Sequence, residues 1–254
     1  MKEGDFEIKG SGTGGISLKN EMLKITSIFL SVDGEVNPKA QGAWSVFIRF
    51  AGCTAGCKYC DTKYSWKGGE DLSVSYILDK VEKIGRGVRK ITITGGEPFE
   101  SYGSSMISLI QKLLLRDYFI TIETNGLHDV EDLLQHASRV GKEDNLSFIL
   151  DWKLPSAGKV STKVKPVNYM DLPSNCFVKF VISDRLDFIN AIKAAGFIRF
   201  NSQAKIYFSP CGGGIDASEL FNWMKDSICP LWGIGYNLQI HKFIFSDDWR
   251  DEEG

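Results

Sequence analysis

The sequence predicts an α/β fold in which a parallel sheet forms an open partial (β/α)6-type barrel. Three observations predict it. Strand-like and helix-like segments alternate about six times, polar or glycine-rich residues follow the strand-like segments, and 254 residues suffice for one large barrel domain. Since eight units are needed to close a full barrel, about six leave the barrel open.

The expected elements follow in order along the chain. Apolar strand-like runs lie at Ile25–Val32 and Trp44–Phe50, and the second of these leads directly into a cysteine-rich loop. We expect Ser73 to cap the first helix and Gly196 to end the fourth. Helices are expected at residues 73–84, 106–117, 129–140, 185–196 and 216–226. Strands are expected at residues 90–98, 118–126, 145–155, 176–183 and 204–211, with a last extended run at 236–245.

The flanks divide the chain into one domain with two appendages. Residues 1–22 contain the glycine-rich run GSGTGG and are expected to form a flexible extension. Residues 23–246 then form the barrel domain, with the cysteine loop at 51–66. Residues 155–175 carry charge and prolines without a clear period, so we interpret them as an inserted loop. The acidic residues 247–254 are expected to be a solvated tail.

Composition excludes several classes of function. The net charge is −2, which argues against a protein that binds nucleic acid through a broad basic face. No apolar run reaches the length of a membrane span, and the first ten residues lack a hydrophobic signal core. Reactive cysteines without an export signal indicate a cytoplasmic protein. The scattered Cys176, Cys211 and Cys229 are expected to be buried free thiols.

Three clustered cysteines point to an iron–sulfur site. Cys53, Cys57 and Cys60 form a C-x3-C-x2-C array, and three thiolates can hold three irons of a cluster. A fourth cysteine is missing from the run, so one iron would be open to a ligand that is not protein. Structural zinc is the plain alternative, but it needs four protein ligands, and the nearest histidine in the sequence is His128.

With the aromatic Tyr59 before the third cysteine, this array resembles the radical S-adenosylmethionine superfamily. Within it, Arg49, the CDT triplet at 60–62 and the run LQIHK at 238–242 most resemble the 7-carboxy-7-deazaguanine synthase family. The resemblance covers most of residues 25–245. It implies an open partial barrel of the radical S-adenosylmethionine type with an N-terminal extension strand and a C-terminal strand. It also implies a [4Fe-4S] cluster, S-adenosyl-L-methionine and Mg²⁺ as cofactors, and a homodimer reduced by an electron donor such as flavodoxin or ferredoxin.

Two motifs at strand ends are the candidates for the cofactor pocket. Thr94 precedes the run Gly95-Gly96-Glu97-Pro98, in which glycines allow close backbone approach and Glu97 can accept from an ammonium group. The resemblance assigns this run to the methionyl amino group, and Glu123 and Asn125 of ETNG to the ribose and backbone contacts. Simple turns are the alternative for both motifs. Lys153 is expected to face either the methionine carboxylate or solvent, and the resemblance places Ser209 and Pro210 near the adenine.

The candidates for substrate binding lie at both ends of the chain. The planar fork of Arg49 suits a carboxylate, and the alternative is a surface arginine paired with an acid. The resemblance assigns Arg49 to the carboxylate of 6-carboxy-5,6,7,8-tetrahydropterin, and Gly34 and Glu35 to the pterin ring. Asp33 departs from the family's pattern there. Gln239 and His241 are expected on one face of the last strand, where a core histidine is the alternative. The resemblance assigns Thr62 to Mg²⁺.

The resemblance therefore implies a lyase that contracts the carboxytetrahydropterin ring to 7-carboxy-7-deazaguanine with loss of ammonia, on the route to 7-deazapurine bases of transfer RNA. The enzyme itself needs no contact with nucleic acid or membrane. Two alternatives stay open. A glycyl-radical-enzyme activase would carry the same cysteine array but dock a protein, which leaves Arg49 and His241 without a purpose. A ferredoxin-like electron carrier would need no pocket for S-adenosylmethionine, so the motifs at residues 95–98 and 123–126 argue against it.

Overall fold

The computed structural model describes residues 21–244, which contain one nine-stranded sheet. The strand order is β3-β1-β2-β4-β5-β6-β7-β8-β9. From β2 to β9 neighbouring strands are parallel, whereas β1 is antiparallel to both β2 and β3. The bounds are β1 Met22–Val32, β2 Trp44–Phe50, β3 Glu70–Ser73, β4 Lys90–Gly95, β5 Phe119–Thr124, β6 Leu146–Asp151, β7 Phe177–Ile182, β8 Lys205–Pro210 and β9 Gly235–Tyr236.

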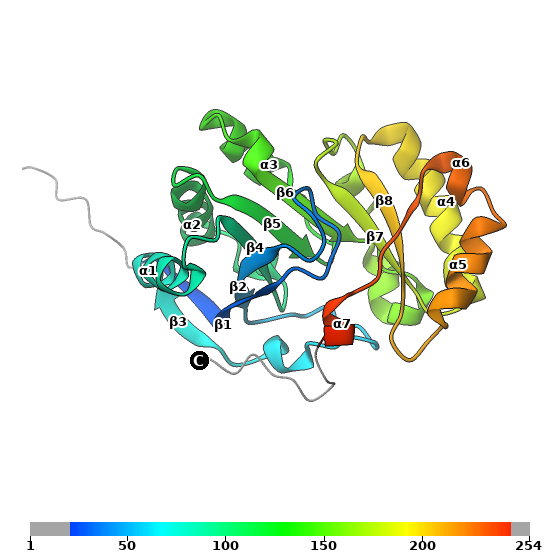
Figure 1. Ribbon diagram of the computed structural model, residues 1–254, viewed down its shortest axis with the longest axis horizontal. Coiled ribbons are helices and arrows are strands. Elements are labelled where there is room, and N and C mark those ends of the chain that lie inside the picture. Colours follow the sequence, from blue (N-terminus) through cyan, green and yellow to red (C-terminus); the bar gives the residue numbers. More distant parts are fainter. Residues whose placement is uncertain (1–20, 245–254) are drawn as a thin grey trace, which may run out of the picture.

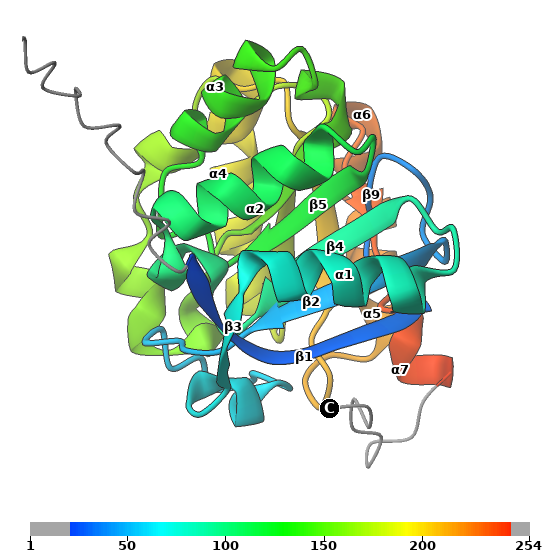
Figure 2. The ribbon, with the colours of Figure 1, turned by 90° about the vertical axis from the view of Figure 1, so that its left-hand side faces the viewer.

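Helices cover the outer side of this sheet (Figures 1 and 2). The barrel stays open because the edge strands β3 and β9 do not pair with each other. The α-helices are α1 Val74–Gly85, α2 Ser104–Leu114, α3 Glu131–Arg139, α4 Arg185–Asn201, α5 Ala217–Lys225, α6 Cys229–Trp232 and α7 His241–Ile244. Short 3-10 helices lie at η1 Lys63–Trp66, η2 Pro98–Ser101, η3 Glu143–Asn145, η4 Pro155–Ala157, η5 Lys159–Lys163 and η6 Pro166–Tyr169. The open partial barrel predicted from the sequence is confirmed.

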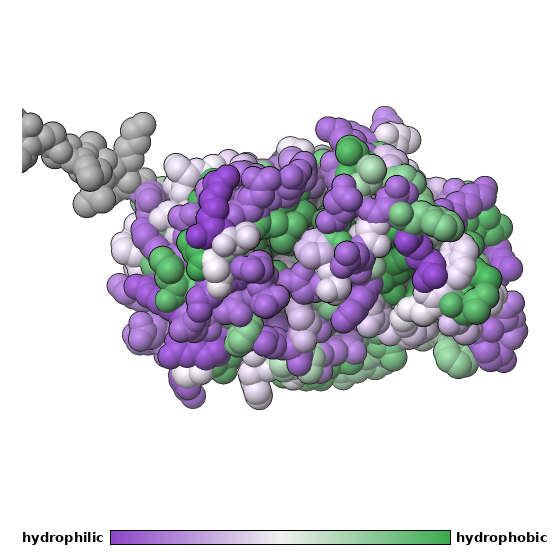
Figure 3. Space-filling view, turned by 90° about the horizontal axis from the view of Figure 1, so that it is seen from above, coloured by the Kyte–Doolittle hydropathy of each residue, from purple (hydrophilic) through white to green (hydrophobic). Residues whose placement is uncertain are grey.

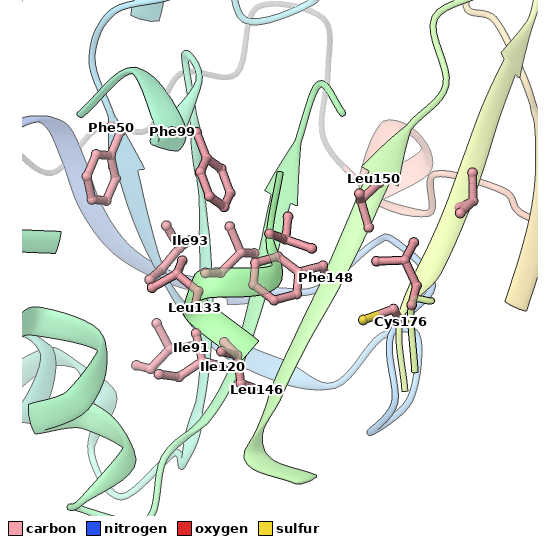
Figure 4. Packing of buried hydrophobic residues seen from close by; sticks show 14 of the residues in the cluster. Phe50, Ile91, Ile93, Phe99, Ile120, Leu133, Leu146, Phe148, Leu150 and Cys176 are labelled. Atoms are coloured by element: carbon pink, nitrogen blue, oxygen red, sulfur yellow. The ribbon is translucent and has the colours of Figure 1, made fainter. Parts of the chain in front are cut away.

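The two faces of the sheet differ in chemistry because side chains alternate along each strand. Apolar side chains of β4, β5 and β6 join the core beneath the helices, and Figure 4 shows Ile93 and Phe148 within it. The opposite face is polar inside the barrel. There the hydroxyls of Ser45 and Thr92 lie 2.8 Å apart, and Ser147 donates to Thr121 over 3.2 Å. The apolar face stabilises the fold, and the polar face is left for ligands.

Two expectations about single elements are wrong. Helix α4 continues through Gly196 to Asn201. Gly196 does not end the helix but lies against the Trp232 ring, from which an added Cβ would be 3.3 Å away. The sequence reading also missed β3, whose residues EDLS are too polar to show strand periodicity. Strand β3 is paired with β1 at the edge of the sheet.

The last extended run, expected at residues 236–245, is also wrong beyond Tyr236. The backbone N–H of Asn237 still donates to Phe208 of β8 over 2.8 Å. The chain then crosses to the β1 side and ends in α7, as the red segment of Figure 1 shows. The Gln41 side chain donates to the carbonyls of Gly34 and Leu238. A side chain therefore takes the place of the neighbouring strand that would otherwise bind the Leu238 carbonyl.

The remaining segments are as follows. Residues 155–175 form no strand or α-helix and contain η4, η5 and η6. The predicted acidic tail and nearly all of the predicted N-terminal extension lie outside the described residues. Between residues 21 and 244, no helix is both long and apolar enough to cross a membrane. Figure 3 shows a mainly polar face, with apolar groups gathered at its right-hand end near α5 and α6.

Candidate active site

A cavity of about 600 Å³ opens at the carboxyl ends of the strands, where ligands of parallel barrels collect. This volume is typical of small-molecule sites. Its wall brings together most of the residues that the sequence indicated. They are Gly34, Glu35, Arg49, Cys53, Cys57, Tyr59, Cys60, Thr62, Thr94, Gly95, Gly96, Glu123, Asn125, Lys153, Gln239 and His241.

The cysteine loop forms one wall of this cavity and fits an iron–sulfur cluster. Cys53, Cys57 and Cys60 all face the cavity, and Gly52 and Gly56 turn the loop with positive φ angles of 98° and 65°. Burial raises the pKa of the Cys53 thiol to about 11 and also raises that of Cys57, so metal binding must displace protons. Within residues 21–244 no three cysteine, histidine or acidic side chains already form a metal-ion cluster. The three cysteine sulfurs in one wall of the cavity are therefore the feature that suits an iron–sulfur cluster.

The paired glycines after β4 hold this loop. A Cβ at Gly95 would lie 2.2 Å from the Phe50 carbonyl oxygen, and one at Gly96 would lie 2.0 Å from that of Gly52. The backbone N–H of Gly96 donates to Phe50, and that of Glu97 donates to Gly52 over 2.7 Å. Only glycine permits this approach, so the motif binds the cysteine loop to β4 in addition to facing the cavity.

Glu97 has a different position from the predicted contact with the methionyl amino group. Its carboxylate is fully buried behind the cavity wall and accepts from Thr124 Oγ1 at 2.8 Å and from the Asn125 and Phe99 amides at 2.7 and 3.1 Å. Burial raises its pKa to about 7, although these bonds oppose the shift. Glu97 thus fixes the end of β5 against η2.

Ser209 and Pro210 also lie outside the cavity wall. Ser209 is buried, and its Oγ atom accepts from the Asn237 side chain at 3.4 Å. The next residues, Cys211 to Gly213, line the cavity instead, so the chain reaches the cavity just after the end of β8. All three scattered cysteines are buried free thiols, as predicted.

Glu123 and Thr94 form a pair on the cofactor side. Thr94 Oγ1 donates to Glu123 Oε2 over 2.8 Å. Burial raises the pKa of Glu123 to about 7, and the charge of Glu35 acts in the same direction. Asn125 lines the cavity while its Oδ1 atom accepts from the Leu127 amide at 2.9 Å. These groups offer hydroxyl-binding oxygens near the cysteine loop.

An ionic chain crosses the floor of the cavity. Lys153 Nζ lies 2.7 Å from Asp151 Oδ2, and Asp151 Oδ1 lies 3.3 Å from Lys179 Nζ. Lys179 Nζ in turn donates to Glu35 Oε1 over 2.9 Å. Lys153 is only 8% exposed, which excludes the alternative in which it faces solvent. Burial opposes the charge of each lysine, but the carboxylates outweigh it and raise the pKa of both.

The C-terminal segment completes the opposite wall through Glu35. Asn237 donates to Glu35 Oε2 over 2.7 Å, and Gln239 donates to its Oε1. His241 lies on α7 rather than on a strand, and burial lowers its pKa. Gly34 must lack a side chain, since a Cβ there would lie 2.4 Å from His241 Nδ1.

Arg49 and Thr62 also line the cavity. The Arg49 guanidinium carbon is 5.5 Å from the centre of the Phe29 ring and 5.7 Å from that of Tyr64. Thr62 Oγ1 donates to Asp61 Oδ1 over 3.2 Å and lies 3.7 Å from Cys60 Sγ. A planar cation between aromatic faces suits a carboxylate ligand.

Lys179 and Asn237 were not predicted from the sequence as site residues, and no role was assigned to Asp33. The one signal for Lys179 is a lysine within the apolar run CFVKFVIS, because a buried lysine requires a partner. Asp33 is fully buried and pairs with Lys90, while Thr92 Oγ1 donates to it over 2.9 Å. Asp33 therefore anchors the turn before Glu35.

Sequence comparison agrees with this geometry. The Radical SAM superfamily matches residues 47–151, which run from β2 through the cysteine loop to the end of β6. The superfamily implies a [4Fe-4S] cluster and S-adenosylmethionine. The 7-carboxy-7-deazaguanine synthase of Clostridium acetobutylicum is 32% identical over 233 residues, covering 89% of this chain and 98% of the relative. The chain belongs to the 7-carboxy-7-deazaguanine synthase family.

Further relatives agree. The 7-carboxy-7-deazaguanine synthase of Methanospirillum hungatei is 32% identical over 239 residues, covering 92% of this chain and 91% of the relative. Among solved structures, that of QueE from Escherichia coli has a TM-score of 0.65 at 19% identity, covering 89% of this chain and 98% of that one. At that identity the likeness supports the fold alone. These relatives favour the 7-carboxy-7-deazaguanine synthase family over the activase and the electron carrier.

Proposed function

We propose that this chain converts 6-carboxy-5,6,7,8-tetrahydropterin to 7-carboxy-7-deazaguanine, with loss of ammonia, in the biosynthesis of 7-deazapurine bases. One observation carries the proposal. Three thiols, the Arg49 guanidinium and the ionised carboxylate of Glu35 line a single cavity large enough for a nucleoside and a bicyclic substrate. An electron carrier needs no such cavity. An activase would dock a protein chain, and Arg49 and His241 on the cavity wall would then have no purpose.

The cofactor half is assigned to the cysteine loop and the ends of β4 to β6. Cys53, Cys57 and Cys60 would hold a [4Fe-4S] cluster, leaving one iron for S-adenosylmethionine. Bound there, these cofactors supply the radical that abstracts hydrogen from the substrate. Glu123 would accept from the ribose hydroxyls, and Lys153 would attract the methionine carboxylate.

The substrate half is assigned to the β1–β2 side and the C-terminal segment. Arg49 would bind the substrate carboxylate through two parallel N–H donors. Glu35, held ionised by Lys179 and oriented by Asn237, would accept from N–H groups of the pterin ring. His241, uncharged at neutral pH because burial lowers its pKa, offers one donor and one acceptor to the ring.

We also propose that Thr62 contributes an oxygen ligand to Mg²⁺. A hard cation takes oxygen ligands and retains several waters, so one hydroxyl suffices where substrate oxygens fill further positions. Thr62 lines the cavity and lies within the cysteine loop, two residues after Cys60.

The assembly and surroundings follow from the same assignment. Thiols that must stay reduced favour a cytoplasmic enzyme. An electron donor such as flavodoxin or ferredoxin would reduce the cluster. We also propose a homodimer, for which the exposed apolar residues Phe200 and Leu231 near α6 offer a candidate face.

Anaerobic turnover tests the proposal. The protein is reconstituted with iron and sulfide, reduced with dithionite, and given S-adenosylmethionine with or without the carboxytetrahydropterin and Mg²⁺. Mass spectrometry follows 5′-deoxyadenosine and 7-carboxy-7-deazaguanine, and we expect pterin-dependent formation of both. Cleavage of S-adenosylmethionine without the deazaguanine would support an activase instead. Single alanine variants of Cys53, Cys57 and Cys60 should lose iron, while Cys176→Ala and Cys229→Ala should retain it.

A further inference from the structure

We propose that exposed lysines beside the cysteine loop form a docking surface for an acidic one-electron carrier protein. The lysine patch consists of Lys58, within the loop, and Lys159, Lys163 and Lys165, within the inserted segment. The proposal rests on the proposed function, because a [4Fe-4S] cluster must be reduced by a one-electron donor before it can cleave S-adenosylmethionine.

The lysine patch is strongly positive. All four lysines are exposed, and residues 155–170 contain no aspartate or glutamate. In residues 51–69 the one acidic residue is Asp61, which pairs with Lys242 over 3.2 Å. The chain as a whole is nearly balanced in charge, at −2, so this run of lysines without acidic neighbours in the same segment is a local separation of charge. Segregated charge of this kind steers the encounter with a partner of opposite charge.

The two lysine-bearing segments are in direct contact at Lys58. The Lys58 backbone N–H donates to the Ala157 carbonyl over 3.2 Å. The Lys58 side chain passes over Gly158, where an added Cβ would lie 3.1 Å from Lys58 Cε. The 3-10 helix η5 starts at the next residue, so Lys58 lies directly beside Lys159.

The inserted segment also packs directly against the cysteine loop. Within η5, Val160 is buried and packs with Ala157 against Cys57, while Lys159 and Lys163 face solvent. A layer of single side chains therefore separates the lysine patch from Cys57. Electron transfer needs such proximity.

The apolar residues next to the patch complete a weak interface. Val167 is 65% exposed and Met170 is 39% exposed, and they lie two and five positions after Lys165 in the chain. Small apolar centres with a charged rim are typical of protein interfaces, and redox encounters fall at the small end of the size range. The expected partner is a carrier with carboxylates around a flavin or iron–sulfur centre. A flavin hydroquinone anion would give up one electron and become the neutral semiquinone, and the cluster would accept that electron without a proton.

The test compares a protein donor with a chemical one. In the variant Lys159→Glu/Lys163→Glu/Lys165→Glu, the charge of the patch is reversed without changing a residue of the cavity wall. A control variant, Lys83→Glu/Arg86→Glu/Arg116→Glu, reverses the same number of exposed charges on and beside α1 and α2. Product formation is measured once with dithionite and once with flavodoxin, its reductase and NADPH. Binding of oxidised flavodoxin, which needs no turnover, is measured by calorimetry from 20 to about 300 mM salt.

We expect the patch variant to lose roughly tenfold or more of its flavodoxin-driven rate and its flavodoxin affinity at low salt. Its dithionite-driven rate should stay within about twofold of the unmodified protein, as both rates should in the control variant. Unchanged flavodoxin binding in the patch variant would overturn the proposal, and so would binding that is independent of salt. Salt-sensitive binding of transfer RNA to the patch without flavodoxin binding would also overturn it. A lack of product with dithionite in the unmodified protein would instead refute the proposed function.

Discussion

Replacing Lys179 with methionine tests the ionic chain on the cavity floor. Lys179 Nζ lies 2.9 Å from Glu35 and 3.3 Å from Asp151, and its side chain is 7% exposed. Removing one partner of a buried ion pair leaves an uncompensated charge, which costs about 3–5 kcal/mol. For a domain of this size each kcal/mol shifts the melting temperature by about 2–4 °C, so we expect a fall of roughly 6–20 °C.

The loss in Lys179→Met should depend on pH, with a sign set by Glu35. Burial raises the pKa of Glu35, but Lys179 outweighs it and holds the pKa below its ordinary value of 4.5. In the unmodified protein, Glu35 therefore stabilises the fold above pH 4.5, and this contribution is lost as the pH falls. In the variant, burial acts without the lysine, so the folded-state pKa rises and the variant loses stability as the pH rises. The difference between the two proteins should thus widen from pH 5 to pH 8.

Urea unfolding of the two proteins at pH 5 and pH 8 measures this difference. Lys112→Met is the matched control, because Lys112 pairs with Glu21 over 2.7 Å but both side chains are well exposed, and such pairs contribute about 0–1 kcal/mol. The double variant Glu35→Gln/Lys179→Met should recover part of the loss, since it removes the stranded charge. A loss in Lys179→Met no larger than that in Lys112→Met, or one equal at both pH values, would refute the reasoning.

Three further predictions concern the cavity wall. Gly34→Ala should raise the KM for the pterin by at least about tenfold, because its Cβ would displace His241, while iron content stays unchanged. Thr62→Ala should slow product formation by at least about tenfold and abolish stimulation by added Mg²⁺. The control Thr54→Ala should keep both, and a magnesium response that survives in Thr62→Ala would exclude that ligand. A carboxyl whose pKa is raised to about 7 opposes folding once it is ionised, so the unmodified protein should lose stability as the pH rises. The free energy of unfolding of Glu123→Gln, measured in urea, should therefore exceed that of the unmodified protein by a margin that grows by up to about 3 kcal/mol from pH 5 to about pH 8.5.

Much of the site could be predicted from local sequence. The cysteine spacing, the glycine pair at residues 95–96 and the apolar strands are local patterns whose chemistry does not depend on distant parts of the chain. The alternation of strands and helices determined the open barrel, because each apolar strand face must be covered by a helix. These features sufficed to place Cys53, Glu123 and Arg49 at one end of the sheet.

Tertiary structure decided the electrostatics of the cavity. Lys179 faces Glu35 across 144 positions of sequence, and Asn237 reaches Glu35 across 202, so no local pattern could reveal either pair. The C-terminal run reads as a strand because its residues are apolar. Its backbone, however, finds partners on the β1–β2 turn, and it ends in α7. Glu97 is likewise predicted from the sequence to contact a ligand. In the structure its carboxylate is buried behind the cavity wall and accepts three hydrogen bonds from protein groups. Residue type and spacing fix which chemistry a chain can carry, but the direction in which a buried charge points depends on partners that only the folded chain brings within reach.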